Sequence, residues 1–392
     1  MVLVDFTITA QEPTDEGVAR AGLLTVRGKV LHTPCFMPVG TLATVKSLTI
    51  ADLTTMGAEC ILGNTYHLHL RPGEDLIQEL GGIHQFMGGW PGLVLTDSGG
   101  YQVFRLAHLR KLDRNGVTFR AHTDGSTHVF TPESVVETQE KLDSDIMMAL
   151  DECPAHTMTE TEAAGSSELT FNWANRSRAA WSGRRGALFG ICQGGMFAEL
   201  RRQSARQLAS LDLPGYGIGG LGLGESKEVF REMVLASTSE LPAAKPRYLM
   251  GIGRPEDLVN SVAMGVDMFD CVLQTREARN GALLTNTGRL NVNNARCARD
   301  PGPIELDCDC ETCQTYSLAY LHHLFRNREL LGYRLATIHN LRWTLRLMEK
   351  VRDHIADGTY GGFRISFTDS YRTRPGDPTS ATAGASPLGG LG

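Results

Sequence analysis

The 392-residue sequence lacks any apolar run near the roughly 18 residues needed to cross a bilayer. Residues 1–10 carry Asp5 and have no basic stretch followed by an apolar one, which argues against a secretory signal peptide. These absences argue against a membrane protein and predict a cytoplasmic one. Because 42% of the residues are hydrophobic and 21% are charged, the chain can form a packed core over most of its length.

The sequence also lacks an excess of positive charge. It contains 38 Lys and Arg and 44 Asp and Glu, which gives a net charge of −6. Affinity for phosphates comes from Lys and Arg, so this balance argues against a protein whose whole surface binds nucleic acid. A local cluster of basic residues can still bind phosphates, although the net charge of the chain is negative. Arginines recur between Arg326 and Arg346, and Arg276 and Arg279 form a pair upstream.

The cysteine count is odd, at nine, which does not fit a disulfide scaffold in a cytoplasmic protein. Three cysteines are clustered at Cys308, Cys310 and Cys313, and this cluster indicates metal chemistry. The others stand singly and are expected to be small core residues: Cys35, Cys60, Cys153, Cys192, Cys271 and Cys297.

There is no internal sequence repeat. The one low-complexity segment, 371–392, is rich in Thr, Pro, Gly, Ala and Ser and is predicted to be a disordered tail. We therefore expect residues 1–370 to form the folded part, including a zinc-binding subdomain over 296–345.

Eight short apolar runs alternate with amphipathic stretches along the chain, which predicts a parallel (β/α)8 TIM barrel of the α/β class. Thr131-Pro132-Glu133 and Arg254-Pro255-Glu256 have the residues of helix starts, and turn signals near Gly28 and at 124–125 suggest added β-hairpins. The predicted strands are Cys35–Val39, Cys60–Leu62, Leu93–Leu95, Ile146–Leu150, Ala187–Ile191, Gly217–Leu221, Tyr248–Gly251 and Met268–Leu273.

Polar residues and glycines follow seven of these runs. Catalytic residues of TIM barrels gather at the carboxyl ends of the strands, so these positions predict one active-site rim. The segments are 64–66, 97–100, 151–153, 193–195, 219–221, 250–251 and 270–271.

Cys308, Cys310 and Cys313 are followed by histidines at His322, His323 and His339. Three thiolates and one imidazole suit tetrahedral zinc in a closed, structural site. Spacing alone does not choose among the histidines, although His339 lies in a helix-like stretch over 335–355. The alternative is three free cysteines and an unrelated helix histidine.

Asp97, Asp151 and Asp270 can meet in one pocket of a barrel. Substitution at a sugar carbon through an oxocarbenium-like state uses one carboxylate as nucleophile and another as acid/base. Taken singly, each aspartate could equally be a helix cap or an ion-pair partner.

The glycine-rich segment 217–224 would let a ligand approach the backbone closely. No Lys-Ser or Lys-Thr follows the glycines, which argues against a phosphate-binding P-loop. Tyr101, beside Asp97, could stack on a flat base at the mouth of a pocket or lie in the core.

Together these segments resemble bacterial tRNA-guanine transglycosylase (queuine tRNA-ribosyltransferase), over residues 5–368. The motifs that carry the resemblance are Asn64-Thr65-Tyr66-His67-Leu68, Thr96-Asp97-Ser98-Gly99-Gly100-Tyr101-Gln102, Leu150-Asp151-Glu152-Cys153, Gly190-Ile191-Cys192-Gln193-Gly194-Gly195, Ile218-Gly219-Gly220-Leu221, Leu249-Met250-Gly251, Phe269-Asp270-Cys271-Val272-Leu273 and the cysteine cluster with Thr337-Ile338-His339-Asn340.

The resemblance implies a double displacement that exchanges the wobble guanine of tRNA. Asp270 would attack C1′ and form a covalent RNA intermediate, and Asp97 would protonate the leaving guanine; exchanged roles would use the same two residues. The remaining implied roles are base binding by Asp151, Gln193, Gly220 and Ser98, stacking by Tyr101 and Met250, RNA binding by Arg276 and Arg279, and zinc binding by Cys308, Cys310, Cys313 and His339.

The implied partners are the anticodon loop of tRNAs with a GUN anticodon, guanine, and the base 7-aminomethyl-7-deazaguanine (preQ1), for queuosine biosynthesis. Cys153 after Asp151-Glu152 is typical of bacterial members and favours preQ1 over queuine. Family members form homodimers through the zinc-bearing region, with one structural zinc ion per subunit.

Three residues depart from the family pattern. Gln274 stands where Pro is usual, and Leu223 and Cys192 each stand where Val is usual. Leu223 and Cys192 could therefore reduce the size of the base pocket.

The rival interpretations are a metal-dependent TIM-barrel hydrolase, a non-catalytic partner subunit and an RNA-binding module without chemistry. Asp97 and Asp270 are both present, which argues against the non-catalytic subunit.

Overall fold

The computed structural model describes residues 4–105, 110–153 and 155–371. Eight parallel strands form one sheet in the order β4-β14-β13-β12-β11-β10-β6-β5. A bridge between Val39 and Leu62, with a hydrogen bond of 2.7 Å from the Gly40 N–H to the Leu62 carbonyl, joins β4 to β5 and closes the sheet. The predicted α/β barrel is confirmed.

All eight predicted runs correspond to barrel strands, although several ends differ. The apolar run predicted over 217–221 is displaced most, because the strand ends at Ile218 and the following glycines form a loop. The strands are β4 (Cys35–Pro38), β5 (Cys60–Gly63), β6 (Leu93–Thr96), β10 (Ile146–Met148), β11 (Ala187–Cys192), β12 (Gly215–Ile218), β13 (Arg247–Leu249) and β14 (Met268–Cys271).

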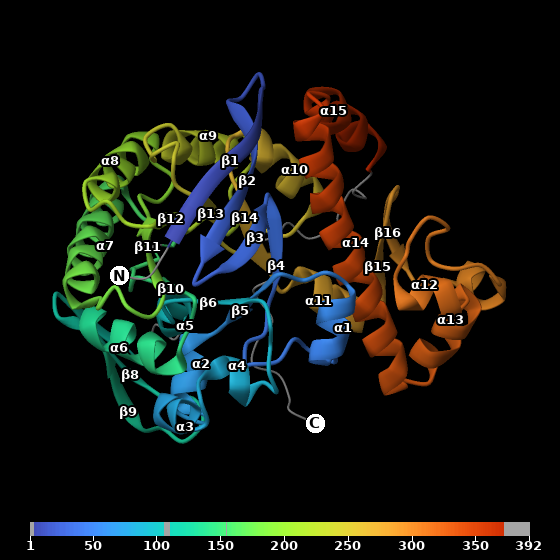
Figure 1. Ribbon diagram of the computed structural model, residues 1–392, viewed down its shortest axis with the longest axis horizontal. Coiled ribbons are helices and arrows are strands. Elements are labelled where there is room, and N and C mark those ends of the chain that lie inside the picture. Colours follow the sequence, from blue (N-terminus) through green and yellow to red (C-terminus); the bar gives the residue numbers. More distant parts are fainter. Residues whose placement is uncertain (1–3, 106–109, 154, 372–392) are drawn as a thin grey trace.

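Helices cover the outside of the barrel, and those from α6 to α10 curve around one side of it in Figure 1. Thr131 caps α6 with a capping box, as its sequence suggests, because its hydroxyl accepts the Ser134 N–H. The helices between strands are α1 (Ile50–Thr55), α2 (Thr65–Leu70), α3 (Glu74–Glu79), α4 (Ile83–Phe86), α5 (Gly100–Arg105), α6 (Pro132–Leu142), α7 (Glu160–Ala180), α8 (Ala198–Ala209), α9 (Lys227–Thr238) and α10 (Pro255–Ala263).

Three antiparallel sheets are added to the barrel, and the first two along the chain each contain a predicted hairpin, whereas the third lies in the C-terminal part. The first consists of β1 (Val4–Pro13), β2 (Val18–Val26) and β3 (Lys29–Thr33), with Arg27 and Gly28 both at positive φ in the turn. The second consists of β7 (Arg110–Asp113), β8 (Gly116–Arg120) and β9 (Thr127–Phe130), inserted between β6 and α6.

The C-terminal part follows β14 and projects from one side of the barrel in Figure 1. Its long helix α14 packs against β4 and β1, so it also serves as a barrel helix. The predicted subdomain boundary at residue 345 falls inside this helix. The elements are α11 (Leu273–Arg279), β15 (Ala282–Thr285), β16 (Gly288–Asn291), a 3-10 helix (Ala295–Arg299), α12 (Glu311–Thr315), α13 (Leu318–Arg326), α14 (Leu330–Ala356) and α15 (Tyr360–Ser370).

Tyr371 is the last described residue of the chain. It is buried and its ring stacks on Phe367 at 5.2 Å and packs against Trp343. The rest of the predicted tail, 372–392, lies outside the described residues. Among the helices of the described part, none is both long and apolar enough to cross a membrane.

Candidate active site

A cavity of about 440 Å³ opens at the carboxyl ends of the barrel strands. Segments that follow all eight strands contribute to it, as expected for a TIM barrel. Of the sequence-predicted site residues, these line the cavity together: Asp97, Ser98, Tyr101, Asp151, Gln193, Gly220, Met250, Asp270 and Arg276.

Asp97 follows β6 and is surrounded by hydrogen-bond donors. Its Oδ1 accepts the N–H groups of Thr65 (2.9 Å) and Gly99 (3.2 Å), and its Oδ2 accepts the side-chain amides of Asn64 (2.5 Å) and Gln102 (3.2 Å). These donors favour the ionised form. Burial outweighs them and, aided by the nearby Asp270 charge, raises the pKa of Asp97 from 3.8 to about 7. A carboxyl with such a pKa can both give and take a proton near neutral pH.

Asp270 lies within β14 on the other side of the cavity. The Tyr248 hydroxyl (2.5 Å) and the Gly251 N–H (2.8 Å) both donate to its Oδ1. Burial raises the pKa of Asp270, while these two donors lower it. Because both donors bind Oδ1, they fix the orientation of the carboxylate and therefore the position of Oδ2.

Asp151 follows β10 and forms a polar group with two neighbours. The Ser98 hydroxyl donates to Oδ1 (2.9 Å) and the Gln193 side-chain amide donates to Oδ2 (2.8 Å). Burial raises the pKa of Asp151 to about 6 despite these donors. The Gln193 Oε1 atom is buried, and the described residues offer it no hydrogen-bond partner. The group can therefore present both acceptors and donors to a bound polar ring.

The glycine-rich loop after β12 approaches this group closely. A Cβ atom at Gly219 or Gly220 would lie 2.5 Å or 2.6 Å from the Gln193 side chain, and Gly220 has a φ of +70°. Only glycine fits both the space and the backbone conformation here. The Glu225 carboxylate holds the loop by accepting the N–H groups of Gly222 and Leu223.

Tyr101 and Met250 lie at the cavity from different elements. Tyr101, on α5, is 39% exposed, so it is not the core residue that the sequence also allowed. Met250 follows β13 and is half-buried against the barrel interior. A ring-shaped ligand in this cavity would have apolar surface available from both residues.

The two arginines after β14 differ in position. Arg276 lines the cavity, whereas Arg279, one turn further along α11, is half-buried and donates to the Thr275 carbonyl at 2.9 Å. Burial lowers the pKa of Arg279. Both residues were predicted to bind RNA, and of the two Arg276 lines the cavity.

The residues that depart from the family pattern are also placed differently. Leu223 lines the cavity, whereas the Cys192 thiol points away from it toward the Arg201 carbonyl and the Ser237 hydroxyl. The expectation that Cys192 trims the pocket is therefore not met. Gln274 is buried and its amide donates to the Gly253 carbonyl at 2.7 Å, which braces the loop that carries Gly251.

Tyr248 and Gln102 contact the aspartates but were not predicted as site residues, and Asn64 was predicted only as part of the rim segment 64–66. Asn64 caps α2 through its Oδ1 atom and also binds Asp97, so one amide performs both tasks. Tyr248 lies inside a strand and carried no polar signal of its own. A weak signal existed for Asn64 and Gln102, because both stand in the motifs that resemble the transglycosylase family.

A buried cluster of Cys308, Cys310, Cys313 and His339 can hold a metal ion. The three sulfur atoms lie 3.8, 3.6 and 3.3 Å from His339 Nδ1. A tetrahedral zinc site with Zn–S near 2.3 Å and Zn–N near 2.0 Å has edges of roughly 3.5 Å, close to these distances. His339 Nε2 lies 2.7 Å from the Leu284 carbonyl, which assigns the proton to Nε2 and leaves Nδ1 free to bind a metal.

The other two histidines are engaged elsewhere. His322 Nδ1 lies 2.8 Å from the Val292 carbonyl, and the His323 ring stacks on Tyr320. His339 is thus the histidine that meets the cysteines, a choice that spacing alone left open.

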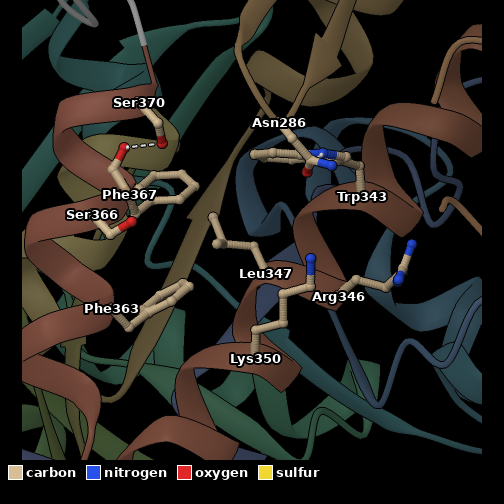
Figure 2. Close-up of a pocket in the computed structure, with 9 residues that line it drawn as sticks. All are labelled: Asn286, Trp343, Arg346, Leu347, Lys350, Phe363, Ser366, Phe367 and Ser370. Carbon is tan, nitrogen blue, oxygen red and sulfur yellow. Dashed lines mark hydrogen bonds between the residues drawn. The ribbon is translucent and has the colours of Figure 1, made fainter. Parts of the chain in front are cut away.

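A second cavity, of about 200 Å³, lies between α14 and α15, far along the chain from the carboxylates (Figure 2). Phe363, Phe367, Trp343 and Leu347 form its apolar wall, and Arg346 and Lys350 extend from α14 beside it. Its lining contains no carboxylate. It therefore lacks the pair of carboxyl groups that the barrel cavity offers.

Comparison with known proteins gives matches over nearly the whole chain. A family model described as queuine tRNA-ribosyltransferase matches residues 15–373. Similar proteins of the same name come from Dehalococcoides mccartyi (52% identity over 370 residues, 94% of this chain and 94% of the relative) and Herpetosiphon aurantiacus (52% over 371 residues, 95% and 94%). A third, from Desulforapulum autotrophicum, is 52% identical over 361 residues, covering 92% of this chain and 96% of the relative.

We predict that Asp97 titrates near neutral pH. Its carboxyl-carbon NMR signal, identified by its loss in Asp97→Asn, should move with a pKa of about 7 instead of 3.8. Folded Asp97 holds its proton more tightly than the unfolded chain does. It therefore favours folding below the unfolded-state pKa of 3.8, and this contribution is lost as the pH rises to about 7.

The stability measurement provides the control. The free energy of unfolding should fall less steeply between pH 4 and about 7 in Asp97→Asn than in the unaltered protein. A signal that titrates near 3.8, with equal slopes in both proteins, would contradict the predicted effect of burial.

Proposed function

The chain belongs to the queuine tRNA-ribosyltransferase family, and on this premise we propose that it exchanges the wobble guanine of tRNAs with a GUN anticodon for preQ1. The observation that supports this most is the pair of buried aspartates, Asp97 and Asp270, in one cavity with different partners. Such a pair fits a double displacement, in which one carboxylate is the nucleophile and the other handles the proton.

Asp270 is the nucleophile in this proposal. Its Oδ2 atom attacks C1′ of the wobble nucleoside while the bond between C1′ and N9 of guanine breaks, and the electron pair of that bond goes to the base. The Tyr248 hydroxyl and the Gly251 N–H bind Oδ1 and so fix the carboxylate plane for the attack. The product is a covalent ester between Asp270 and the RNA, which retains a reactive C1′.

Asp97 is the acid and base. In its protonated form, which a pKa of about 7 makes available, it gives its proton to the leaving guanine. It then takes a proton from the incoming base as the nitrogen of that base attacks C1′ and releases Asp270. The cycle restores both carboxyls to their starting forms, and two inversions at C1′ give overall retention.

Asp151, Ser98, Gln193 and Gly220 hold the edge of the base. Guanine presents a carbonyl acceptor at C6 and an amino donor at C2. The Asp151 carboxylate can accept from the amino edge, and the Gly220 N–H and the Gln193 amide can donate to the carbonyl. Tyr101 and Met250 supply apolar surface to the two faces of the ring.

The incoming base is proposed to be preQ1 because Cys153 lines the cavity after Asp151-Glu152. The wobble base must leave the anticodon stack to enter a cavity of this kind. Arg276 at the cavity wall would bind an RNA phosphate, and Arg279, one turn further along α11, would also contact the RNA backbone.

Zinc is the proposed metal of the Cys308, Cys310, Cys313 and His339 cluster. Four protein ligands fill a tetrahedral site, so this metal would be structural, and we expect one ion per subunit. It would join α12 and the segment before it to α14.

The zinc-bearing region also supports the proposed homodimer. Leu306 is 90% and Leu330 is 79% exposed, and the exposed Tyr320 stacks on Tyr316 in the same region. These exposed apolar side chains offer surface that a second subunit could cover. The cytoplasm, where tRNA is modified, is the proposed location.

Guanine exchange tests the proposed reaction. The protein should incorporate radiolabelled guanine into an unmodified tRNA with a GUN anticodon, and preQ1 should displace it irreversibly. Asp270→Asn and Asp97→Asn should each lower the exchange rate by a factor on the order of 10³ or more, because each removes a reacting group. Asp357→Asn, at an exposed position on the end of α14, should not change the rate.

Continuous release of free guanine without an acceptor base would instead indicate a hydrolase. RNA binding without either reaction would indicate a binding module.

Metal analysis tests the zinc site. Purified protein should contain about one zinc per chain by elemental analysis, and Cys313→Ser and His339→Ala should lose it, because three ligands hold zinc less tightly than four. Cys297→Ser is the matched control, since Cys297 is buried in the same region but lies outside the cluster. Full zinc content in both cluster variants would contradict the assignment.

A further inference from the structure

Arg201 carries a fully buried charge directly behind the base-binding residues. It lies on α8 with 0% of its surface exposed, and no carboxylate among the described residues forms an ion pair with it. Burying a guanidinium without such a partner is costly, so its hydrogen bonds must compensate. Burial also lowers the pKa of Arg201.

The hydrogen bonds of Arg201 go to two backbone carbonyls on separate loops. Nε donates to the Gly195 carbonyl at 2.8 Å and Nη2 donates to the Gly219 carbonyl at 3.1 Å. The Arg201 side chain also packs on Gly194, where an added Cβ would lie 3.0 Å from its Cγ. One planar guanidinium therefore connects the loop that carries Gln193 to the loop that carries Gly220.

The Gly219 carbonyl belongs to the same peptide unit as the Gly220 N–H. In a trans peptide these two groups point in opposite directions, so fixing the carbonyl toward Arg201 aims the N–H away from it. Both glycines line the cavity, and the described residues provide no acceptor for the Gly220 N–H. Flanking glycines restrict a peptide weakly, so this orientation needs an external partner.

A charged donor on the carbonyl has a second effect. It polarises the peptide, which makes the N–H on the other side a stronger hydrogen-bond donor. An Arg can reach both carbonyls with its fork of N–H groups, whereas the single ammonium of a Lys cannot hold two acceptors in that fixed plane.

We propose that Arg201 is a positioning residue, which orients and polarises the Gly219–Gly220 peptide so that its N–H binds the C6 carbonyl of the base. This inference rests on the proposed function of the cavity. It assigns Arg201 no contact with the base itself. Its effect should therefore depend on the group that the base offers at C6, which separates positioning from a general role in folding.

Direct binding of two bases to Arg201→Met and Arg201→Lys tests the inference. Guanine has an oxygen at C6, whereas 6-thioguanine keeps the other edge groups and has sulfur, a poor acceptor, at C6. Calorimetry should show about tenfold or greater weakening for guanine in Arg201→Met, and less than about threefold for 6-thioguanine. Arg201→Lys should lie between, and Arg202→Met, at a partly exposed neighbour on α8, should bind both bases normally.

The outcomes separate clearly. Equal weakening of both bases in Arg201→Met and Arg201→Lys, or unchanged guanine binding in either variant, would overturn the positioning role. Arg201→Lys keeps the buried charge, and its thermal unfolding is compared with that of the unaltered protein, so the test does not depend on Arg201→Met being stable. If the unaltered protein neither binds guanine nor exchanges it into tRNA, the proposed function fails, and this inference fails with it.

Discussion

Closure of the barrel between β4 and β5 is the constraint on which the candidate active site depends. The bridge from Val39 to Leu62 turns a row of eight strands into a ring. In an open sheet of this order, β14 and β6 would be separated by four strands. In the ring, only β4 and β5 lie between them on the closed side, so Asp270 and Asp97 come to one cavity although 173 positions separate 97 from 270 in the chain.

The second determinant of the site is how each buried carboxyl is paired. Asp97 receives four donors spread over both oxygens, whereas Asp270 receives two donors on a single oxygen. Burial raises both pKa values, and the Asp270 charge contributes further to that of Asp97. Two chemically identical residues thereby acquire different environments, which is the physical basis for giving them different roles.

Much of this could be predicted from the sequence, and the limits have physical causes. Parallel strands buried on both faces appear as short apolar runs, so all eight were found, and polar residues after those runs predicted the cavity lining. Cys192 was misjudged because sequence position does not give the direction of a side chain. Tyr248 was missed because a buried tyrosine in a strand resembles a core residue until its hydroxyl is seen to donate to Asp270. His339 was separated from His322 and His323 by spatial position, which spacing alone could not provide.

We propose that Asp270 forms a covalent bond to the RNA, and this bond can be detected. The most direct measurement is to trap the protein with anticodon stem-loop RNA and a guanine-like inhibitor, digest the denatured adduct, and identify the modified peptide by mass spectrometry. We expect a ribonucleotide attached at Asp270, within the segment Met268–Cys271. A ribonucleotide attached at Asp97, or RNA exchange without any covalent adduct, would contradict it.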